Sequence, residues 1–566
     1  MNLLGLACYY HDASATLVRD GEIVAAAHEE RFNRRKTSPD FPIEALNTCL
    51  QAADLTLDDV DAVAFYEKPF LKFERVILSH VRAWPSSLPI FRATIPPWLQ
   101  DRLILPLTLR HEHGYRGDVH FVDHHLAHAA SAFLASPFED AAVLVADGVG
   151  EWATTTIGRG DEGGVRLLEE IRFPDSLGLL YTAVTTWLGF EALKGEGKVM
   201  ALADFGEPRF LPQFLDFCHL RDDGSFHLDP AFFGIVEGER MYGRRFVEVF
   251  GPPRVPGAEI TALHQDVAAS LQRFLEEALL RIARYLHGRV PASRLCLAGG
   301  CCLNITATSR IAEETPFGDL FIQPAAGDAG GSLGAALYLH HALTGRRGPP
   351  MTTACLGPAF GVGAIGRALK ARGVPYRDVP EQDLPALVAG WIAQGRVVGW
   401  FEGRMEFGPR ALGHRSILAD PRVPDMKDTL NARVKHREPF RPYGVSVLRE
   451  EVGAFFDFDR DSPYMLQVAR VRPGGAERIP AAVHVNGTSR IQTVRREEEP
   501  LYYALISAFR DLTGIPMVIN TSFNDNNEPI VCTPDDALGC FLRSEMDALV
   551  MGTCVVEARP DPIPAG

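Results

Sequence analysis

Apolar residues fall along the chain in short runs bounded by glycine, proline or Asp-Gly, a pattern typical of β-strands joined by tight turns. Residues 3–7 and 11–18 predict a strand, a polar turn and a second strand, and Asp20-Gly21 predicts a hairpin turn before a third strand. The same strand–turn–strand pattern recurs at residues 143–157. Two such hairpins suggest duplicated half-domains, although Asp-Gly hairpins are common and, taken alone, favour a purely structural interpretation.

Helical periodicity, with apolar residues three or four positions apart, is clearest at residues 261–286 and 384–394. We expect the first helix to be core scaffolding and the second to precede a strand at 397–401. Between them, residues 344–350 are rich in proline, glycine and arginine, as linkers often are. The 566 residues also exceed what one hydrophobic core usually holds, so two or three domains are expected. We place a first domain at residues 1–345, a linker at 346–356 and a second domain at 357–566.

The composition is that of a soluble globular protein, with 46% hydrophobic and 23% charged residues. The 57 Lys and Arg against 72 Asp and Glu give a net charge of −15, which disfavours non-specific binding to nucleic acid or membranes but allows a local anion pocket. The ten cysteines include no CxxC pair, so we expect free thiols in a reducing compartment. No charged-then-apolar leader opens the sequence and no apolar run reaches the ~18–20 residues of a membrane span, so we expect a cytoplasmic protein.

Residues 123–133, with the sequence DHHLAHAASAF, have the composition of a helix, for which Asp123 is a candidate N-cap. On such a helix His124 and His128 lie four positions apart and project from one face, while His125 points roughly 100° away. Two imidazoles placed in this way can share one metal ion.

Two acidic residues are candidates to complete such a metal site. Asp147 follows an apolar strand predicted at 141–146, and Asp328 lies in a glycine-rich loop before a helical segment at 332–337. Oxygen and imidazole ligands together suit divalent iron, manganese or zinc. The alternative stays open, because two histidines at this spacing are more often structural or solvent-facing, and the zinc-protease pattern His-Glu-x-x-His is absent.

Two glycine-rich segments are candidates for contact with a phosphate or a nucleotide. In residues 194–200 (KGEGKVM), glycines allow close backbone approach and lysines offer positive charge, with a flexible surface loop as the alternative. Residues 295–304 predict a strand, a Gly-Gly turn and the start of a helix, which would present free N–H groups to adenosine or phosphate. A Gly-Gly turn can equally serve packing alone. The candidate residues are Lys198, Gly299, Gly300 and Asn304.

The C-terminal half holds the densest group of cations, at 403–418, 435–443 and 488–490, and a polar run follows at 520–524. These cations alternate with glycine, proline and aromatic residues, which favours one anion pocket over a solvated surface. Arginine can bind phosphate oxygens in bidentate fashion, and lysine acts as a point charge. A mixed-charge run at 29–36 is, by contrast, most simply an exposed or ion-paired surface.

Nine motifs lie in order along the chain: HDASA (11–15), HHLAHAASAF (124–133), DGVGEW (147–152), GEGKVMALADFG (195–206), GGCCLN (299–304), GDAGGSLGAA (327–336), EFGPRALGHRSILADPR (406–422), KHREPFRPY (435–443) and NTSFNDNNEPIVCTP (520–534). Together they resemble the O-carbamoyltransferases of antibiotic and nodulation-factor biosynthesis, which include the nebramycin, cephamycin and ansamycin carbamoylation enzymes. The resemblance covers nearly the whole chain, and the EFGPRALG and KHRE segments are its most specific parts.

The resemblance implies an α/β enzyme with α+β character in its C-terminal part. Its N-terminal domain would be a duplicated domain of the actin and sugar-kinase type (ASKHA), and its C-terminal domain would have the YrdC-like fold. Such enzymes form carbamoyl-AMP from carbamoyl phosphate and ATP, which binds with Mg²⁺, and they release phosphate and pyrophosphate. In the N-terminal domain a hydroxyl of a small natural-product acceptor then takes the carbamoyl group, and AMP leaves.

The same resemblance implies roles for individual residues. Carbamoyl phosphate or carbamate would be held by Lys435, Arg490, Asn520 and Ser522, of which Lys435, Arg490 and Ser522 also count as catalytic. Arg410 and Arg415 would bind the nucleotide phosphates. A divalent metal, iron(II) first with manganese or zinc as alternatives, would bind His124, His128, Asp147 and Asp328 and polarise the adenylate phosphate.

An acceptor alcohol also requires a general base near the carbamoyl carbon. His11 is the candidate, because its ordinary pKa suits neutral pH and the family shows His-Asp there. A structural role for His11 and Asp12 in the hairpin is the alternative. The walls of the acceptor pocket are expected from residues 66–115 and 205–255, which carry no readable signature.

Two other functional classes are compatible with parts of the sequence. An actin-like kinase would use the N-terminal half alone and leave the C-terminal cations without a purpose. A tRNA threonylcarbamoyl-type transferase would use related chemistry, but a basic surface rather than a charge of −15 would be expected. We therefore expect a small hydroxylated acceptor as the partner, with neither nucleic acid nor membrane, and leave a homodimer open.

Overall fold

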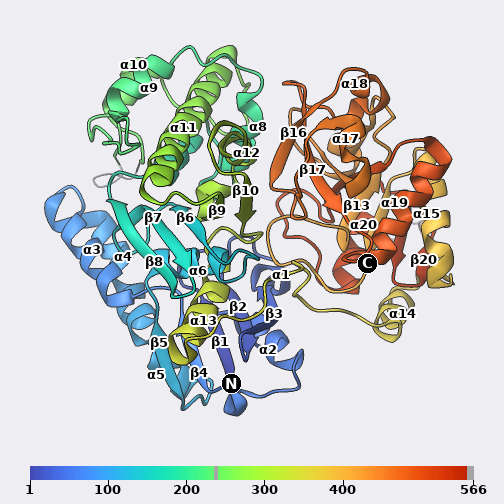
Figure 1. The fold of residues 1–566 in the computed structure, drawn as a ribbon, viewed down its shortest axis with the longest axis horizontal. Helices are drawn as coiled ribbons and strands as arrows, with labels where there is room; N and C mark the ends of the chain where they lie inside the picture. The colour runs from blue at the N-terminus through green and yellow to red at the C-terminus, as the bar shows by residue number, and fades with distance from the viewer. Residues whose placement is uncertain (235–239, 558–566) are drawn as a thin grey trace. The chain divides into compact units, whose positions relative to one another are not determined.

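The computed structural model describes residues 1–234 and 240–557, and the chain divides into two compact units (Figure 1). Unit 1 comprises residues 1–29 and 37–351, and unit 2 comprises residues 30–36 and 352–566. A short segment from the N-terminal part of the chain therefore belongs to the C-terminal unit. Residues 235–239 of the expected acceptor region and residues 558–566 of the expected second domain lie outside the described residues.

Unit 1 contains two five-stranded sheets that share one topology. In the first, of order β3-β2-β1-β4-β5, the first three strands are antiparallel neighbours and the last two run parallel to β1. In the second, of order β8-β7-β6-β9-β10, the same rule holds around β6. This is the repetition that the two predicted hairpins suggest. The strands are β1 (Asn2–Ala7), β2 (Ser14–Arg19), β3 (Glu22–His28), β4 (Ala62–Phe65), β5 (Asp118–Phe121), β6 (Ala141–Ala146), β7 (Ala153–Asp161), β8 (Gly164–Arg172), β9 (Arg294–Ala298) and β10 (Asp319–Ile322).

The helices predicted at 124–133 and 261–286 are confirmed as α6 and α11. Residues 194–200 do not form a flexible loop, because α8 begins at Glu196, whose carboxylate accepts hydrogen bonds from the Thr182 hydroxyl and the Leu193 N–H. The helices of unit 1 are α2 (Ile43–Gln51), α3 (Pro69–Arg82), α4 (Leu88–Gln100), α5 (Leu105–His111), α6 (His124–Phe133), α7 (Leu177–Trp187), α8 (Glu196–Ala203), α9 (Leu211–Cys218), α10 (Arg244–Phe250), α11 (Ala262–Arg289), α12 (Ile305–Glu314) and α13 (Ala329–Thr344).

Helices α6 and α13 pack against each other, with α13 on β1 and β2 of the first sheet and α6 on β6 and β9 of the second. Small residues allow this close approach. A Cβ atom on Gly334 would lie 1.8 Å from the carbonyl oxygen of Ala127, and one on Gly5 would lie 1.9 Å from that of Ser332. The histidines of α6 are therefore held where the two halves of unit 1 meet.

Unit 2 is built on a ten-stranded sheet of mixed direction, of order β11-β20-β19-β12-β13-β18-β14-β17-β16-β15. The pairs β12–β19 and β14–β17 are parallel and the other pairs are antiparallel. The strand predicted at 397–401 is β12. The strands are β11 (Arg377–Asp378), β12 (Val398–Phe401), β13 (Arg415–Ala419), β14 (Gly444–Leu448), β15 (Phe456–Asp457), β16 (Gln467–Val471), β17 (Thr488–Val494), β18 (Met517–Ser522), β19 (Ala548–Met551) and β20 (Cys554–Val556).

The helix predicted at 384–394 is confirmed as α15, which packs against α19. One hydrophobic core joins these helices to the sheet and includes Trp391, Trp400 and Phe509. Both units are therefore of mixed α and β composition, as the sequence predicts. The helices of unit 2 are α1 (Glu30–Asn33), α14 (Val362–Ala371), α15 (Leu384–Ala393), α16 (Met426–Thr429), α17 (Val452–Phe455), α18 (Gly475–Arg478), α19 (Pro500–Thr513) and α20 (Pro534–Arg543).

Two general expectations can be compared with these elements. All ten cysteines are free thiols, and only Cys301 is partly exposed, which confirms the expectation of unpaired, mostly buried cysteines. Among the helices formed by residues 1–234 and 240–557, none combines the length and the apolar character that a membrane span requires.

Candidate functional site

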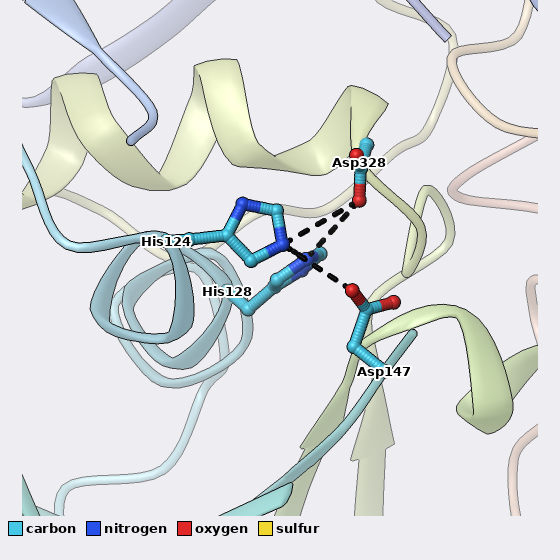
Figure 2. Close-up of side chains that lie close together, drawn as sticks. All are labelled: His124, His128, Asp147 and Asp328. Atoms are coloured by element: carbon cyan, nitrogen blue, oxygen red, sulfur yellow. Dashed lines mark hydrogen bonds and ion pairs between the residues drawn. The ribbon is translucent and has the colours of Figure 1, made fainter. Parts of the chain in front are cut away.

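Helix α6 carries His124 and His128 on one face, as their spacing predicts (Figure 2). Its start differs from the expectation, because the carboxylate of Asp123 accepts a hydrogen bond from Lys68 at 2.7 Å and does not cap the helix. Instead, the carboxylate of Glu151 accepts the backbone N–H of His124 at 3.1 Å. An acidic residue from a distant loop therefore fixes the beginning of this helix.

Four buried side chains of unit 1 converge on one point (Figure 2). The Nε2 atoms of His124 and His128 lie 3.1 Å apart. Asp147, at the end of β6, places Oδ2 3.3 Å from Nε2 of His124. Asp328, just before α13, places Oδ1 3.6 Å from both Nε2 atoms. The four predicted ligands are thus gathered, with one ligand atom from each residue within 4.8 Å of the others.

The donor set of this cluster fits a divalent cation. Two imidazole nitrogens with two carboxylates suit iron(II), manganese(II) or zinc(II). The Oδ1 atom of Asp328 is buried and has no hydrogen-bond partner within the described part of the chain. Burying such an oxygen atom costs folding free energy unless a cation or a hydrogen-bond donor interacts with it. The other carboxylate is oriented from behind, because Oδ1 of Asp147 accepts the N–H of Gly300 at 2.8 Å.

The charges in the cluster are set by the histidines and carboxylates together. Burial alone would raise the pKa of both carboxyl groups. The hydrogen bond with His124 nevertheless holds the Asp147 pKa well below its usual range, and His11 and His124 lower the Asp328 pKa to about 2. Burial opposes charge on His124 too, but Asp328 and Asp147 raise its pKa. Both carboxylates are thus ionised at neutral pH, which is the state that a cation requires.

Two further histidines lie near this cluster. His125 faces away from it, with Nδ1 3.0 Å from Oγ1 of Thr156, and burial lowers its pKa to about 3. His11 lies beside it, with Nδ1 3.0 Å from Asp12 and Nε2 3.6 Å from Asp328. Burial opposes charge on His11, but Asp328 raises its pKa well above the ordinary value. The candidate base and the candidate metal ligands therefore form one group.

The Gly-Gly turn predicted to bind a nucleotide is explained by packing. Gly299 has φ +91°, and a Cβ atom there would lie 2.2 Å from the carbonyl oxygen of Ala146. The N–H of Gly300 is bonded to Asp147 and is not free to meet a phosphate. The turn thus orients a metal-ligand candidate, and the expectation of free N–H groups is wrong for Gly300.

The other two predicted nucleotide contacts of unit 1 also have protein partners. Asn304 caps α12 by accepting the N–H of Ala307 at 3.1 Å, and its Nδ2 donates to Gln272 at 2.8 Å. Lys198 lies on α8 with Nζ 5.7 Å from the centre of the Phe190 ring. The structure assigns Asn304 a capping role and places Lys198 on a helix rather than in a loop.

Four half-buried arginines of unit 2, Arg410, Arg437, Arg441 and Arg490, lie near enough to influence one another. Desolvation lowers the Arg490 pKa well below its ordinary value, and the charges of the other three lower it further. Desolvation also lowers the Arg410 and Arg441 pKa values to about 10. Within the described residues, the buried Nε atoms of Arg410 and Arg490 have no hydrogen-bond partner. Mutually repelling, incompletely bonded cations indicate an anion site.

Two predicted ligands in this region flank Gly444 on the sheet. Arg490 on β17 and Asn520 on β18 both pair with Gly444 on β14, so all three positions share one face. A Cβ atom on Gly444 would lie 2.9 Å from Nε of Arg490, so the glycine leaves the space that the guanidinium occupies. Asn520 is fully buried, and its Nδ2 donates to the carbonyl of Ala411 and the hydroxyl of Ser446 at 3.1 and 2.9 Å.

Lys435 is buried and braces a neighbouring loop. Its ammonium group donates to the carbonyl oxygens of Ser522 and Asn524 at 2.7 and 2.6 Å, and to Oδ1 of Asn524 at 2.6 Å. Burial, with Arg437 acting in the same direction, holds the Lys435 pKa well below its ordinary value. The predicted pair of Lys435 and Ser522 is therefore brought together, with the ammonium hydrogens directed at protein oxygens.

Comparisons with known proteins identify the family. Residues 2–337 match the family model described as "Carbamoyltransferase N-terminus", and residues 389–558 match the one described as "Carbamoyltransferase C-terminus". The chain belongs to the carbamoyltransferase family. It is accordingly an enzyme of the transferase class.

Three relatives show how far this similarity extends. The carbamoyltransferase is 44% identical to the uncharacterized protein sll1178 of Synechocystis, over 99% of this chain and 97% of that protein. It is 38% identical to the nodulation protein NolNO of Sinorhizobium fredii, over 97% of this chain and 79% of that protein. It is 32% identical to the 3'-hydroxymethylcephem-O-carbamoyltransferase of Amycolatopsis lactamdurans, over 68% and 69% of the two chains. The predicted resemblance to O-carbamoyltransferases is confirmed.

One predicted phosphate ligand of the carbamoyltransferase has a different place in the structure. Arg415 is fully buried, its guanidinium lies 3.7 Å from the centre of the Phe401 ring, and NH1 donates to the carbonyl of Glu402 at 2.7 Å. It also donates to the carbonyls of Gly403 and Pro358. With NH1 and NH2 directed at backbone oxygens, Arg415 supports the loop before β13. Its Nε has no partner within the described residues, and its contact with a nucleotide stays a prediction.

Two further features shape the carbamoyltransferase site in unit 2 and are not among the predictions from the sequence. Oε1 of Glu406 accepts the backbone N–H groups of Leu412, His414 and Arg415, and so organises the 411–415 loop. The mixed-charge run at 29–36 is not simply an exposed surface, because Arg31 is buried and donates to the carbonyl of Gly408 at 2.8 Å. The motif around Gly408 gave a signal for the first feature, whereas only the three-dimensional fold reveals the second.

Proposed function

We propose that this carbamoyltransferase is an ATP-dependent O-carbamoyltransferase, which makes carbamoyl-AMP in unit 2 and transfers the carbamoyl group to an acceptor hydroxyl in unit 1. The observation that supports this best is the presence of two chemically different sites in one chain, one suited to anions and one suited to a metal cation. Unit 2 holds arginines that depress one another's pKa, and unit 1 holds a buried cluster of histidines and carboxylates. On this proposal unit 1 has the duplicated actin and sugar-kinase type fold, which its repeated sheet topology supports, and unit 2 has the YrdC-like fold.

The activation step overcomes the low reactivity of carbamate, whose oxygen must become part of a good leaving group. We assign to unit 2 the hydrolysis of carbamoyl phosphate to carbamate and phosphate. A carbamate oxygen then attacks the α-phosphorus of ATP, which binds with Mg²⁺, and pyrophosphate leaves. Two sets of side chains in unit 2 would bind two anions. Arg490 with Ser522 and Lys435 would hold carbamoyl phosphate, with Asn520 positioning the loop behind them, and Arg410 would meet the nucleotide phosphates.

Charge is the physical reason for this assignment. Each bound phosphate would replace lost solvation and offset the repulsion among guanidinium groups that lowers the Arg490 pKa. The same groups are preorganised to stabilise the negative charge that develops on the oxygens around phosphorus. Arg437 and Arg441, which act on Arg490, would contribute to this field without being predicted ligands.

The transfer step is assigned to unit 1, where His124, His128, Asp147 and Asp328 would hold a divalent ion, iron(II) or else manganese(II) or zinc(II). When bound, the ion would supply Lewis acidity to the phosphate of the adenylate. The acceptor oxygen attacks the carbamoyl carbon and AMP leaves. His11, oriented by Asp12, would take the proton of the acceptor hydroxyl.

The products of the first step distinguish this function from the alternatives. The purified full chain with carbamoyl phosphate, ATP and Mg²⁺ is expected to release pyrophosphate and form carbamoyl-AMP, whereas a kinase would yield ADP. Lys435→Ala, which removes the brace of the 522–524 loop, is expected to abolish pyrophosphate release. Arg510→Ala, at a partly exposed position of α19, serves as the control and should leave pyrophosphate release unchanged. Production of ADP without pyrophosphate would overturn the proposal.

The partner is proposed to be a small hydroxylated molecule, and neither nucleic acid nor membrane is invoked, in keeping with the net charge of −15. A panel of hydroxylated natural products, incubated with the enzyme, carbamoyl phosphate and ATP, would be scored by mass gain of one carbamoyl group. A product that forms only when ATP is present identifies the acceptor class.

A further inference from the structure

Three side chains of unit 2 that lie far apart in the sequence meet at a second cluster of possible metal ligands, here called the Cys355 site. Cys355 lies in the segment that precedes α14, His414 in the loop before β13, and Glu499 at the N-cap of α19. Nε2 of His414 lies 2.8 Å from Oε2 of Glu499, and Sγ of Cys355 lies 3.8 Å from Oε1 of Glu499. The three ligand atoms all lie within 4.8 Å of one another.

The histidine is oriented as a metal ligand would be. Nδ1 of His414 lies 3.1 Å from the carbonyl oxygen of Glu402, which can only accept a hydrogen bond, so Nδ1 carries the proton. The ring is thereby turned with Nε2 toward both Cys355 and Glu499. Metal-binding histidines are commonly held in this way by a backbone carbonyl behind the ring. A nucleophilic Cys–His–Glu triad would instead place the thiol and the carboxylate at opposite ring nitrogens.

We propose that the Cys355 site binds a zinc ion through Cys355, His414 and Glu499, with water as the fourth ligand. Ligand atoms around tetrahedral zinc lie about 3.3–3.8 Å apart, as the usual zinc–ligand bond lengths dictate. The 3.8 Å separation of sulfur and oxygen fits this range, and the 2.8 Å contact opens by less than about 1 Å. Thiolate and carboxylate together neutralise the charge of the ion. Binding releases to solvent the thiol proton and any proton shared by His414 and Glu499.

The chemistry of the Cys355 site differs from that of the cluster in unit 1. The unit 1 cluster offers imidazole and carboxylate ligands alone, whereas the Cys355 site adds a soft thiolate, which favours zinc. Its exposure also suits an ion that exchanges with solvent, because Cys355 is buried while the side chains of His414 and Glu499 are 13% and 20% exposed. A water ligand can therefore reach the fourth position.

An ion at the Cys355 site would fix a loop that supports the arginine cluster. His414 belongs to the loop in which the carbonyl of Ala411 accepts a hydrogen bond from Asn520 and the carbonyl of Leu412 accepts one from Gln492. Cys355 is anchored on the other side, since the N–H of Phe407 donates to the carbonyl of Ala354 at 2.7 Å. The ion would thus have a positioning role, because it would connect the segment before α14, which contains Cys355, to the loop before β13, which contains His414.

Cobalt(II) gives a direct test on the full chain, because only thiolate ligands produce a sulfur-to-cobalt charge-transfer band in the near ultraviolet. After removal of bound metal with a chelator, cobalt is expected to produce this band to a limit of one equivalent. Cys355→Ser should abolish the band, and His414→Asn should raise the cobalt concentration required for the band at least tenfold. His128→Ala, in unit 1, should leave the band unchanged.

Cys554→Ser is the matched control, because Sγ of Cys554 also faces a carboxylate, that of Asp378 at 3.6 Å. Among the described residues, Cys554 is not part of a cluster of three possible ligands. This variant should retain the full band. Absence of the band in the parent chain, or its persistence in Cys355→Ser, would overturn the proposal.

The melting temperature gives a second test, which remains valid even if Cys355→Ser fails to fold. Zinc is expected to raise the melting temperature of the chelator-treated chain, and Glu499→Gln, which keeps the shape of the side chain, should require at least tenfold more zinc for the same shift. An identical zinc dependence in Glu499→Gln and the parent would contradict the proposed ligand set. Neither experiment requires carbamoyl transfer, so their outcome is separate from that of the proposed function.

Discussion

At the scale of single residues, the same side-chain type serves opposite purposes in this enzyme. Arg415 directs its donors at backbone carbonyls and stacks on Phe401, whereas Arg490 is half-buried, repelled by other cations and incompletely bonded. NH1 and NH2 of the first arginine already have protein partners, although its Nε, like that of Arg490, has none within the described residues. Arg490 is the one that we propose to bind an anion. The positions of partners, and not the density of arginine in the sequence, therefore separate structural cations from ligand-binding ones.

The glycine beneath Arg490 offers a residue-scale prediction. Gly444→Ala would place a Cβ atom 2.9 Å from Nε of Arg490 and should displace the guanidinium. We expect the KM for carbamoyl phosphate in pyrophosphate release to rise about tenfold, equivalent to ~1.4 kcal/mol. Gly453→Ala, on α17, is the control, because a Cβ atom there meets nothing within 4 Å. Equal KM values in the two variants would show that Arg490 does not bind this substrate.

His484 predicts a pH dependence of stability in unit 2. Burial, with Arg490 acting in the same direction, lowers its pKa from 6.5 to about 4, so the folded chain takes up this proton only at lower pH than the unfolded chain. This contribution to stability is complete above pH 6.5 and is lost as the pH falls toward 4, by at most about 3 kcal/mol.

Urea unfolding of the full chain between pH 7.5 and pH 4.5 tests this expectation. His484→Gln keeps a donor for the carbonyl of Tyr443 but removes the titration, so its stability should fall less steeply over this range. A parallel loss of stability in the variant and the parent would assign the effect to other groups.

At the scale of elements, the packing of α13 against α6 and the two sheets aligns the candidate metal ligands. Asp328 immediately precedes α13 and the two histidines lie on α6, so the distance between the helices sets the distance between the ligands. The absence of a side chain at Gly334 makes that distance short.

Gly334→Ala should therefore disturb both stability and metal binding. Its Cβ atom would lie 1.8 Å from the carbonyl oxygen of Ala127, so the helices must separate at a cost of about 1–3 kcal/mol. We expect a lower melting temperature and weaker cobalt binding at the cluster of His124 and His128. Gly288→Ala, on α11 where a Cβ atom meets nothing within 4 Å, should be neutral or stabilising by up to ~1 kcal/mol. Unchanged cobalt binding in Gly334→Ala would argue against this coupling.

Elements with a strong local pattern could be predicted from the sequence, and elements fixed by distant contacts could not. Helices α11 and α15 follow apolar periodicity, α6 follows from its composition, and the pair of His124 and His128 follows from helical spacing. Helix α8 was missed because its glycine-rich sequence has low helix propensity, and its start is stabilised by Thr182. The capping of α6 by Glu151 had no local signal at all.

At the scale of the whole molecule, the chain combines two units with different chemistry. Unit 1 repeats one sheet topology and holds the histidine–aspartate cluster, and unit 2 holds the arginines around a ten-stranded mixed sheet. Residues 30–36 belong to unit 2 although their neighbours in sequence on both sides belong to unit 1. The sequence predicts both sites from their residue types. It does not predict the placement of residues 30–36 in unit 2, because that placement involves distant contacts such as the hydrogen bond from Arg31 to the carbonyl of Gly408.

The central claim is that activation and transfer are carried out by different units of one chain. It is tested most directly by following carbamoyl-AMP in single-turnover reactions of full-length Arg490→Ala and His128→Ala variants with carbamoyl phosphate, ATP and Mg²⁺. The account predicts that Arg490→Ala forms no carbamoyl-AMP, whereas His128→Ala forms as much as the parent and fails to pass the carbamoyl group to an acceptor. Loss of carbamoyl-AMP formation in His128→Ala to the same extent as in Arg490→Ala would contradict it.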